Sequence, residues 1–391
     1  MKQKYCFFDK FKRFLKKIIL FLFRTLPVKK NLIIFESNPD FSDNTYALYK
    51  FIRKEYPRYK CIWLCHSNHN IKQLDSNTMA LYEKKALKKY YYMSICSRYF
   101  YTHVRAQDMK PRKKQKFYEI WHGSPGKKFN PILISNKSND NIFVTPTQYT
   151  FDIYHKNYQM NTKNYILCNH PRNDFFDFDF DLIESNNAEK QFNISDYSKS
   201  IIWLPTFRRG KDKSKNLFDN FSIHMTFDEF YNLNSFLAKK RIQLIVKLHP
   251  MVVNAELSDY QKFSNIKFLT SFDLAKSGVQ LYSLIGQCDA LISDFSSVVY
   301  DFMQLDRPIG YVLCDLNKFE SSATDGFIYD NIYDFIAGDT IYSYGDLCEF
   351  INKVSINIDD YKEKRHKIAK MYVGNQIPGS ICEYFCNIIK L

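Results

Sequence analysis

Five short polar motifs, each at the end of a strand-like apolar run, constrain this chain more than any other feature. In order they are Trp121-His122-Gly123-Ser124-Pro125-Gly126-Lys127, Pro171-Arg172-Asn173-Asp174, Pro205-Thr206-Phe207-Arg208, Lys247-Leu248-His249-Pro250 and Ser293-Asp294-Phe295-Ser296-Ser297. Each joins cationic or hydroxyl side chains to a turn residue. In an open α/β sheet, ligands bind outside the carboxyl ends of the strands. The pattern therefore predicts a site for a phosphate-rich substrate.

Strand-like and helix-like segments alternate on both sides of a polar, linker-like stretch at 177–195. Before it, strands are expected at 32–35, 61–65, 99–104, 117–121, 142–144 and 165–167, and helices at 43–55, 82–92 and 149–158. After it, strands are expected at 201–204, 242–248, 266–269, 290–292 and 309–313, and helices at 228–240, 281–287 and 297–305. We therefore expect an α/β fold with two Rossmann-like domains facing a cleft, at 31–190 and 191–391.

The first thirty residues differ from the rest in charge. They carry ten Lys or Arg and only Asp9 as an acid, so they supply +9 of the formal net charge of +15. Apolar residues recur there at helical spacing, at Phe7, Phe11, Phe14, Ile18 and Leu22. The longest apolar run, 18–23, is far shorter than the roughly 20 residues that span a bilayer. We expect 1–30 to lie as a basic amphipathic helix on an anionic membrane surface. The alternative is a helix packed on the protein itself.

The mild charge of the remaining chain predicts no nucleic-acid partner. Ten cysteines without regular spacing are typical of free thiols in a reducing compartment. The alternative is a zinc cluster of Cys61, Cys65, His66 and His69. A metal–diphosphate site at Asp177 and Asp179 is a further alternative to a solvated linker. No metal site or cofactor is predicted, and dependence on a divalent metal ion stays open.

The motifs of the second half place anion-binding groups at three expected strand ends. Ser296 and Ser297 begin a helix, where free N–H groups and the helix dipole attract an anion. His249 follows a strand beside Lys247, and its imidazole can donate to a phosphoryl oxygen. The expected donor and phosphate site also includes Arg208, Thr206 and Asp294. Ordinary helix capping by one serine, and a histidine satisfied in the core, are the alternatives.

The motifs of the first half supply a candidate base. His122 ends a strand, and Gly123 permits a tight turn that leaves the imidazole at the cleft. Because imidazole titrates near neutrality, His122 can accept a proton from a substrate hydroxyl. The catalytic candidates are therefore His122 and His249. On the acceptor side, the residues expected to bind substrate or phosphate are Lys127, Arg172 and Asp174.

Together these residues resemble the CDP-glycerol glycerophosphotransferase family, the teichoic-acid-type primases and polymerases. The matching elements are Trp-His-Gly-x-Pro, Pro-Arg-Asn-Asp, Pro-Thr-Phe-Arg, His-Pro and Asp-aromatic-Ser-Ser, the last followed by Asp301 and Pro308. The resemblance covers roughly residues 31 to 385. Asp325 stands where the family usually has arginine, and Ala337-Gly338-Asp339 replaces a Pro-Gly-Pro element. These departures leave the choice between glycerol and ribitol open.

The resemblance implies a GT-B-like fold and a peripheral enzyme on the cytoplasmic face of the cell membrane. It implies transfer of glycerol phosphate, or a related polyol phosphate, from CDP-glycerol or another CDP-polyol to a lipid-linked or polymeric acceptor of teichoic acid or capsule. In similar enzymes the histidine matching His122 is the proposed base, and the groups matching His249, Ser296 and Ser297 are associated with the donor phosphates. The alternatives are a GT-B glycosyltransferase that uses a CMP-sugar, as sialyltransferase-like capsule enzymes do, and a non-catalytic peripheral membrane protein.

Overall fold

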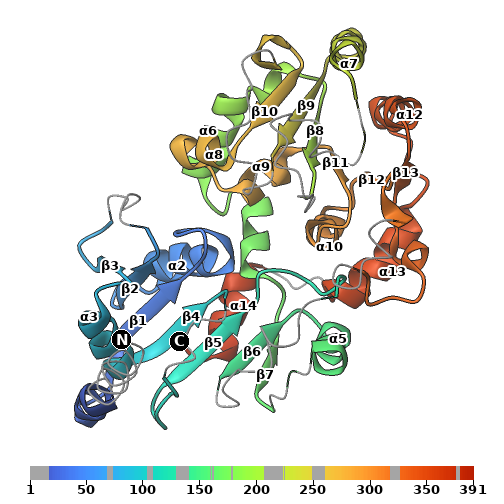
Figure 1. Ribbon diagram of the computed structural model, residues 1–391. Helices are drawn as coiled ribbons and strands as arrows, with labels where there is room; N and C mark the ends of the chain where they lie inside the picture. Colours follow the sequence, from blue (N-terminus) through green and yellow to red (C-terminus); the bar gives the residue numbers. More distant parts are fainter. Residues whose placement is uncertain are drawn as a thin grey trace, which may run out of the picture.

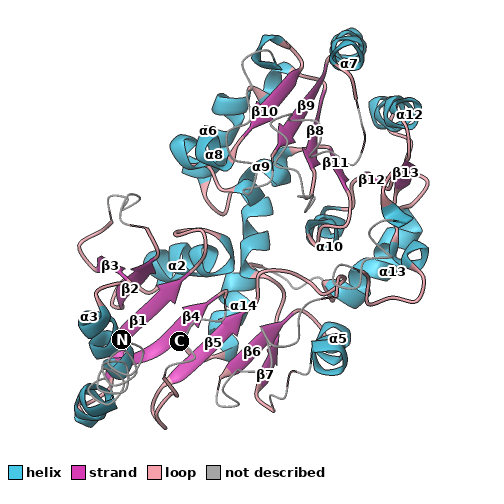
Figure 2. Cartoon of the chain, viewed as in Figure 1, coloured by secondary structure: helices cyan, strands magenta, loops and turns pink. Residues whose placement is uncertain are grey.

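The computed structural model (Figure 1) describes residues 17–67, 74–103, 109–128, 141–158, 160, 163–177, 179–206, 223, 225–248, 260–317, 326–375 and 379–391. Two parallel sheets dominate it, and Figure 2 shows each sheet accompanied by helices. The expected α/β class is therefore confirmed. His249, Arg208 and Asp325 lie outside the described residues.

The first sheet has the strand order β3-β2-β1-β4-β5-β6-β7, and all neighbours are parallel. Its strands are β1 (Lys29–Glu36), β2 (Lys60–Cys65), β3 (Thr78–Tyr82), β4 (Cys96–Tyr101), β5 (Lys116–Ile120), β6 (Ile142–Thr145) and β7 (Tyr165–Leu167). Helices α2 (Asp43–Glu55), α3 (Ala86–Ile95) and α5 (Gln148–Tyr158) belong to this half. Alternate residues of β1 enter two separate cores, Ile33 and Phe35 one and Leu32 and Ile34 the other, as in a sheet covered on both faces.

The second sheet has the order β10-β9-β8-β11-β12-β13 and is also parallel. Its strands are β8 (Lys199–Leu204), β9 (Ile242–Lys247), β10 (Ile266–Leu269), β11 (Ala290–Ser293), β12 (Ile309–Val312) and β13 (Asp339–Ile341). Its helices are α6 (Leu182–Phe192), α7 (Phe227–Lys240), α8 (Ser271–Ser277), α9 (Leu281–Gln287), α10 (Val298–Phe302), α12 (Tyr344–Ser355) and α13 (Lys362–Tyr372). Short 3₁₀ turns are η2 (Pro171–Phe176), η3 (Ile194–Asp196), η5 (Tyr260–Lys262), η6 (Met303–Leu305) and η7 (Ile332–Phe335).

Most expected elements are present, and the differences have local causes. The helix expected at 82–92 begins at Ala86, because Tyr82 ends the edge strand β3 and residues 83–85 form the turn that follows it. The stretch expected as a linker at 177–195 contains α6, whose N-cap Asp181 accepts the Glu184 N–H at 3.2 Å. The buried face of α6 carries Ala188 and Phe192, so this polar-looking segment is anchored in the core.

The last helix, α14 (Ile381–Ile388), packs on the first sheet although the chain reaches it from the second (Figure 1). The Phe385 ring lies 6.1 Å from Phe100 and 5.8 Å from Tyr118, measured between centroids. The chain thus crosses between the two sheets once near η2 and α6 and once more before α14. The boundary expected between residues 190 and 191 stays a prediction.

At the N-terminal end, residues 17–25 form a helix that packs on the first half through one side only. Leu20 packs against a core, and the Phe23 ring meets Tyr91 edge-on at 5.6 Å. Phe21 is 70% exposed and Leu22 57%. Within the described part of the chain, no helix has the length and apolar character needed to cross a bilayer. Phe7, Phe11 and Phe14 lie outside that part, so the amphipathic helix of 1–30 stays a prediction.

Candidate active site

A cavity of about 770 Å³ lies between the two halves of the fold. Strand order reverses between β1 and β4 in the first sheet and between β8 and β11 in the second, and the cavity is lined by loops after β1, β8 and β11. Such topological switch points are where open α/β sheets bind ligands. The predicted site residues that line the cavity are His122, Lys127, Arg172, Thr206, Lys247, Asp294, Ser296 and Ser297.

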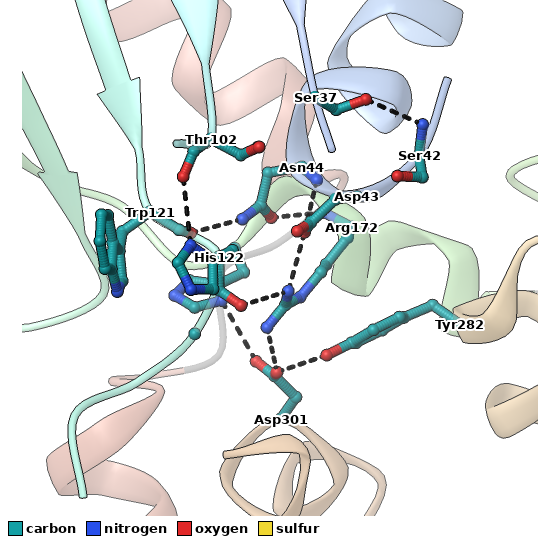
Figure 3. Close-up of polar contacts among 12 residues, drawn as sticks. Ser37, Ser42, Asp43, Asn44, Thr102, Trp121, His122, Arg172, Tyr282 and Asp301 are labelled. Carbon is teal, nitrogen blue, oxygen red and sulfur yellow. Dashed lines mark hydrogen bonds and ion pairs between the residues drawn. The ribbon is translucent and has the colours of Figure 1, made fainter. Parts of the chain in front are cut away.

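His122 is held by contacts with its ring rather than by a charged partner. Its Nδ1 lies 3.2 Å from the Thr102 carbonyl oxygen (Figure 3). Its ring stacks on His103, with the two ring centroids 4.3 Å apart. A carbonyl oxygen only accepts, so Nδ1 carries the proton in this contact. In the neutral ring Nε2 then has the free lone pair, which is the arrangement that a general base requires.

The environment keeps this imidazole neutral. Burial and the neighbouring His103 lower the pKa of His122 from 6.5 to about 4, although Asp43 and the Thr102 carbonyl act in the opposite direction. At neutral pH the free enzyme therefore presents His122 in the form that accepts a proton. Negative charge bound beside the ring would raise its pKa and make the imidazole a stronger base.

The turn after His122 approaches the second half closely. A Cβ atom on Gly123 would lie 2.6 Å from the Ser297 Oγ, so only glycine fits here without movement of Ser297. A few residues further on, Lys127 pairs with Phe327 as an antiparallel bridge, and the Lys128 N–H donates to the Gly326 carbonyl at 2.7 Å. The loop that carries His122 and the loop that carries Ser297 are thus neighbours across the cavity.

The serine pair and Thr206 have different hydrogen-bonding roles. Ser297 precedes α10, but its side chain does not cap that helix, and Ser296 Oγ accepts only a long 3.5 Å contact from the Val298 N–H. The capping alternative therefore does not account for Ser297. Asp294 accepts from both the backbone N–H and the hydroxyl of Thr206, joining the ends of β8 and β11. Asp294 thus organises the loop rather than facing the cavity as a free carboxylate.

Lys247 is a cationic residue of the second half that lines the cavity and could bind a phosphate. It ends β9, is 7% exposed, and its Nζ donates to Ser271 Oγ at 2.9 Å. Burial lowers its pKa from 10.5 to about 8. At pH 7 the ammonium is still the main form, and a bound anion would favour it further.

Arg172 was expected to bind substrate, but it lies in a buried network within the protein. Its Nη2 donates to Asp301 Oδ2 at 2.7 Å, and its Nη1 donates to Asp43 Oδ1 and to the His122 carbonyl, both at 2.8 Å (Figure 3). Although burial alone would lower it, the carboxylates of Asp301 and Asp43 raise the pKa of Arg172. Removing one partner of such a buried pair costs roughly 3–5 kcal/mol.

Asp174, the other residue expected on the acceptor side, does not line this cavity. Its carboxylate accepts from the Ser380 hydroxyl at 2.6 Å and from the Ile381 and Cys382 N–H groups at 2.7 and 2.8 Å. These are the first residues of α14, so Asp174 fastens the last helix to η2. A carboxylate placed in this way satisfies helix N–H groups rather than a substrate.

Sequence reasoning missed three residues of the network. Asp43 was expected only as the first residue of a helix at 43–55, yet its carboxylate binds Arg172. Asp43 has φ of 64°, in the left-handed region that aspartate tolerates. Tyr282 donates to Asp301 at 2.6 Å, and His103 stacks on His122. Asp43 lies in the segment that follows strand β1, and this position could have indicated a residue of the site. No sequence pattern near Tyr282 indicates a role for that residue.

A second cluster of titratable groups lies at the ends of β1, β2 and β3. Among the described residues, Glu36, His66 and Glu83 are a group that could hold a metal ion. However, Glu36 lies 3.3 Å from His66 Nε2, whereas Glu83 lies 3.1 Å from the opposite nitrogen, Nδ1. This arrangement fits an imidazole held between two carboxylates better than one ion shared by all three. Cys61 and Cys65 of the zinc alternative are free thiols buried in β2, and burial raises the pKa of each to about 12.

Comparison with known proteins identifies the family. The family described as CDP-Glycerol:Poly(glycerophosphate) glycerophosphotransferase matches residues 18–376. The chain is 25% identical over 335 residues to the teichoic acid poly(glycerol phosphate) polymerase of Bacillus subtilis (strain 168), covering 80% of this chain and 43% of that protein. It is 26% identical over 347 residues to the polymerase of the same name from Bacillus spizizenii, covering 82% of this chain and 84% of that protein.

A solved structure shares the fold. The wall teichoic acid polymerase TagF superposes with a TM-score of 0.77 at 21% sequence identity, covering 98% of this chain and 96% of that one. An S. aureus MnaA–UDP structure superposes with a TM-score of 0.50 at 8% identity, which agrees with the GT-B-like arrangement. The family match favours the phosphotransferase interpretation over the CMP-sugar and non-catalytic alternatives. Because the family match extends over most of the chain, the chain belongs to the CDP-glycerol:poly(glycerophosphate) glycerophosphotransferase family.

Proposed function

We propose that this enzyme transfers glycerol phosphate from CDP-glycerol to a hydroxyl on a lipid-linked or growing surface polymer and releases CMP. The observation that carries the proposal is His122, a neutral imidazole with Nδ1 bound to a carbonyl, beside the loop that presents Ser297. Family membership supplies the donor class. One structure of the polymerase TagF was obtained after a soak with CDPG, which supports the same donor here.

In the proposed reaction, the acceptor oxygen attacks the β-phosphorus of CDP-glycerol. The proton of that hydroxyl passes to His122 Nε2 as the new oxygen–phosphorus bond forms. The bond between the β-phosphorus and the bridging oxygen breaks, and CMP leaves with that oxygen and its charge. The His122 imidazolium then returns the proton to solvent.

The second half would hold the donor phosphates. Lys247, Ser296 and Ser297 offer an ammonium and two hydroxyls along the cavity wall. Donors fixed before reaction stabilise charge that develops on the diphosphate, and this is usually the largest catalytic contribution. Arg208 and His249, which the structure does not describe, stay proposed members of this donor site.

The test is CMP release by the purified enzyme with a panel of donors: CDP-glycerol, CDP-ribitol and a CMP-sugar. We expect release with CDP-glycerol only when an acceptor polyol phosphate is present. Release with the CMP-sugar and not with either CDP-polyol would reverse the proposal.

Substitution of both Ser296 and Ser297 by alanine is expected to weaken CDP-glycerol binding. Each lost hydrogen bond to a charged group is worth about 1.5–3 kcal/mol, or roughly 10- to 150-fold in Kd. Isothermal titration calorimetry measures this directly. The matched control is Ser355→Ala, at the exposed end of α12, which should leave Kd unchanged. Unchanged donor affinity in the double variant would remove both serines from the donor site.

We also propose that the N-terminal segment holds the enzyme on the cytoplasmic face of the membrane. Ile18, Phe21 and Leu22 face solvent, whereas Leu20 and Phe23 pack on the protein. The ten Lys or Arg residues within 1–30 add attraction to anionic lipid, about 1 kcal/mol for each one near the surface. One side of the helix therefore packs on the protein, and we propose that the other side contacts lipid.

Phe21→Glu combined with Leu22→Glu is expected to release the enzyme from anionic vesicles and leave its fold intact. The substitutions place charge on the exposed side only, and raised salt should add to the loss of binding. Co-sedimentation with phosphatidylglycerol vesicles is the measurement, with phosphatidylcholine vesicles for comparison. Phe272→Glu is the control, since Phe272 is 74% exposed on α8. If the double variant still sediments like the parent enzyme, this side of the helix does not bind lipid.

A further inference from the structure

Arg172 joins the two halves of the enzyme beside His122, the proposed base. Through Nη1 it contacts two groups of the first half, the Asp43 carboxylate and the His122 carbonyl. Through Nη2 it contacts Asp301 of α10, and the Tyr282 ring lies 4.6 Å from the guanidinium carbon (Figure 3). One planar guanidinium thus bridges the loop that carries His122 and a helix of the second half.

Asp301 is a fixed anchor for this bridge. It is 1% exposed and also accepts from Tyr282 at 2.6 Å and from the Asn173 amide at 3.3 Å. Although burial alone would raise it, Arg172 and His170 lower the pKa of Asp301, so the carboxylate stays charged. Asp301 lies on α10, the helix that Ser296 and Ser297 directly precede. Ser296 and Ser297 and the anchor of Arg172 therefore belong to one structural element.

The loop on the other side of the bridge also depends on it. Phe41, between β1 and α2, and Asp43, the first residue of α2, have positive φ, at 54° and 64°. Such backbone conformations persist in non-glycine residues only when the surroundings hold them. The Arg172 contact with Asp43 Oδ1 holds this loop, and the Asn44 amide donates to the Trp121 carbonyl at 2.8 Å. The loop in turn supports the turn that presents His122.

We propose that Arg172 and Asp301 form a positioning pair that fixes the His122 loop relative to α10 and its donor-side serines. This inference rests on the proposed function of His122 and deepens it. It replaces the expectation that Arg172 binds substrate, because the side chain is 5% exposed and engaged on both sides. The alignment of His122 with the bound CDP-glycerol then depends on the contacts of Arg172 that join the two halves.

The charges around His122 give this proposal a specific signature. His103, Asp43 and Arg172 are the titratable or charged groups that act on the imidazole, together with the Thr102 carbonyl. Arg172 lowers the pKa of His122 and Asp43 raises it, whereas Asp301 is not among the groups with the largest effects. Loss of the Arg172 charge should therefore raise the pH at which activity falls on the acid side. Neutralising Asp301 should misplace the base with little change in that pH.

The experiment compares Asp301→Asn and Arg172→Gln with a matched buried pair. Arg365 is fully buried between Asp306 and Asp359, away from the cavity lining, so Asp359→Asn breaks a similar pair without touching His122. For Asp301→Asn we expect kcat to fall on the order of 10- to 100-fold, as for a misplaced catalytic group, with KM for CDP-glycerol nearly unchanged. Asp359→Asn should lower the melting temperature but leave kcat of the folded enzyme unchanged.

Several results would overturn the proposal. If folded Asp301→Asn keeps the parental kcat, the pair does not position His122. If kcat falls equally in Asp359→Asn, the effect comes from general loss of stability and not from the position of His122. A rise in KM with unchanged kcat means that Arg172 binds substrate instead. If Asp301→Asn does not fold, Tyr282→Phe removes only the hydrogen bond to Asp301, and a smaller fall in kcat is expected.

A readout independent of turnover separates this proposal from the proposed function. NMR titration of the His122 ring should give a higher pKa in Arg172→Gln than in the parent enzyme and little change in Asp301→Asn. If the parent enzyme releases no CMP from CDP-glycerol, the proposed function fails, and the titration still tests the pair. An unchanged His122 pKa in Arg172→Gln would mean that the guanidinium charge does not act on the imidazole, and it would overturn this signature of the proposal.

Discussion

Replacing His122 with asparagine is expected to lower kcat for CMP release by about 10²- to 10⁴-fold, the usual contribution of a general base. Asparagine can still donate to the Thr102 carbonyl, so the loop should keep its place, but it cannot take the proton of the acceptor hydroxyl. Donor affinity should change little. Steady-state kinetics with CDP-glycerol and calorimetry on the same protein make the comparison.

The control for this substitution is His155→Ala, because His155 lies on the exposed side of α5, outside the cavity lining. It should keep parental turnover. The acid limb of kcat/KM in the parent enzyme is expected well below pH 6.5, since burial and His103 hold the pKa of His122 near 4. Near-parental turnover in His122→Asn would remove His122 from the base role.

Gly338→Ala is expected to have the largest effect on stability. A Cβ atom at this position would lie 1.9 Å from the Ile309 carbonyl oxygen and 2.8 Å from its carbon, both backbone atoms of β12. Neither can move without breaking the pairing of β12 with β13, in which Gly310 lies opposite Asp339. We expect a loss of more than about 4 kcal/mol, or no folded protein. Soluble yield and the midpoint of thermal unfolding measure it.

Gly345→Ala is the matched control, a few residues away in α12. Its nearest neighbour would be Ser343 Oγ at 3.5 Å, an ordinary contact. Alanine is favoured over glycine in a helix by about 0.4–1 kcal/mol where the backbone permits it. A Gly338→Ala protein as stable as Gly345→Ala would mean that the two strands tolerate separation.

The sequence was sufficient for the fold class and for many of the residues that line the candidate cavity. Apolar runs such as Ile201–Leu204 and Ala290–Ile292 read as buried parallel strands, and the polar residues directly after them, Thr206 and Asp294, do meet. This works because parallel strands bring their carboxyl ends to one edge of the sheet. The family resemblance followed from the same residues, and the family match confirms it.

The roles of Arg172 and Asp174 could not be predicted in the same way. An arginine at a strand end serves a substrate or a buried carboxylate equally well, and the choice depends on Asp301, which is 129 residues away in sequence. Asp174 binds N–H groups of α14, 207 and 208 residues further on. A local sequence pattern cannot reveal such partners, because they depend on how distant parts of the chain pack together. For Asp174 the partner depends on the return of α14 to the first sheet.

The most direct test of the account is the fate of the glycerol phosphate. The enzyme is incubated with CDP-glycerol labelled in the glycerol and an acceptor polyol phosphate, and the products are separated and analysed by mass spectrometry and ³¹P NMR. We expect CMP and label in equal amounts, with the label in a new phosphodiester on the acceptor, and neither product with His122→Asn. Free glycerol phosphate at the same rate without acceptor, or label transfer by His122→Asn at the parental rate, would contradict it.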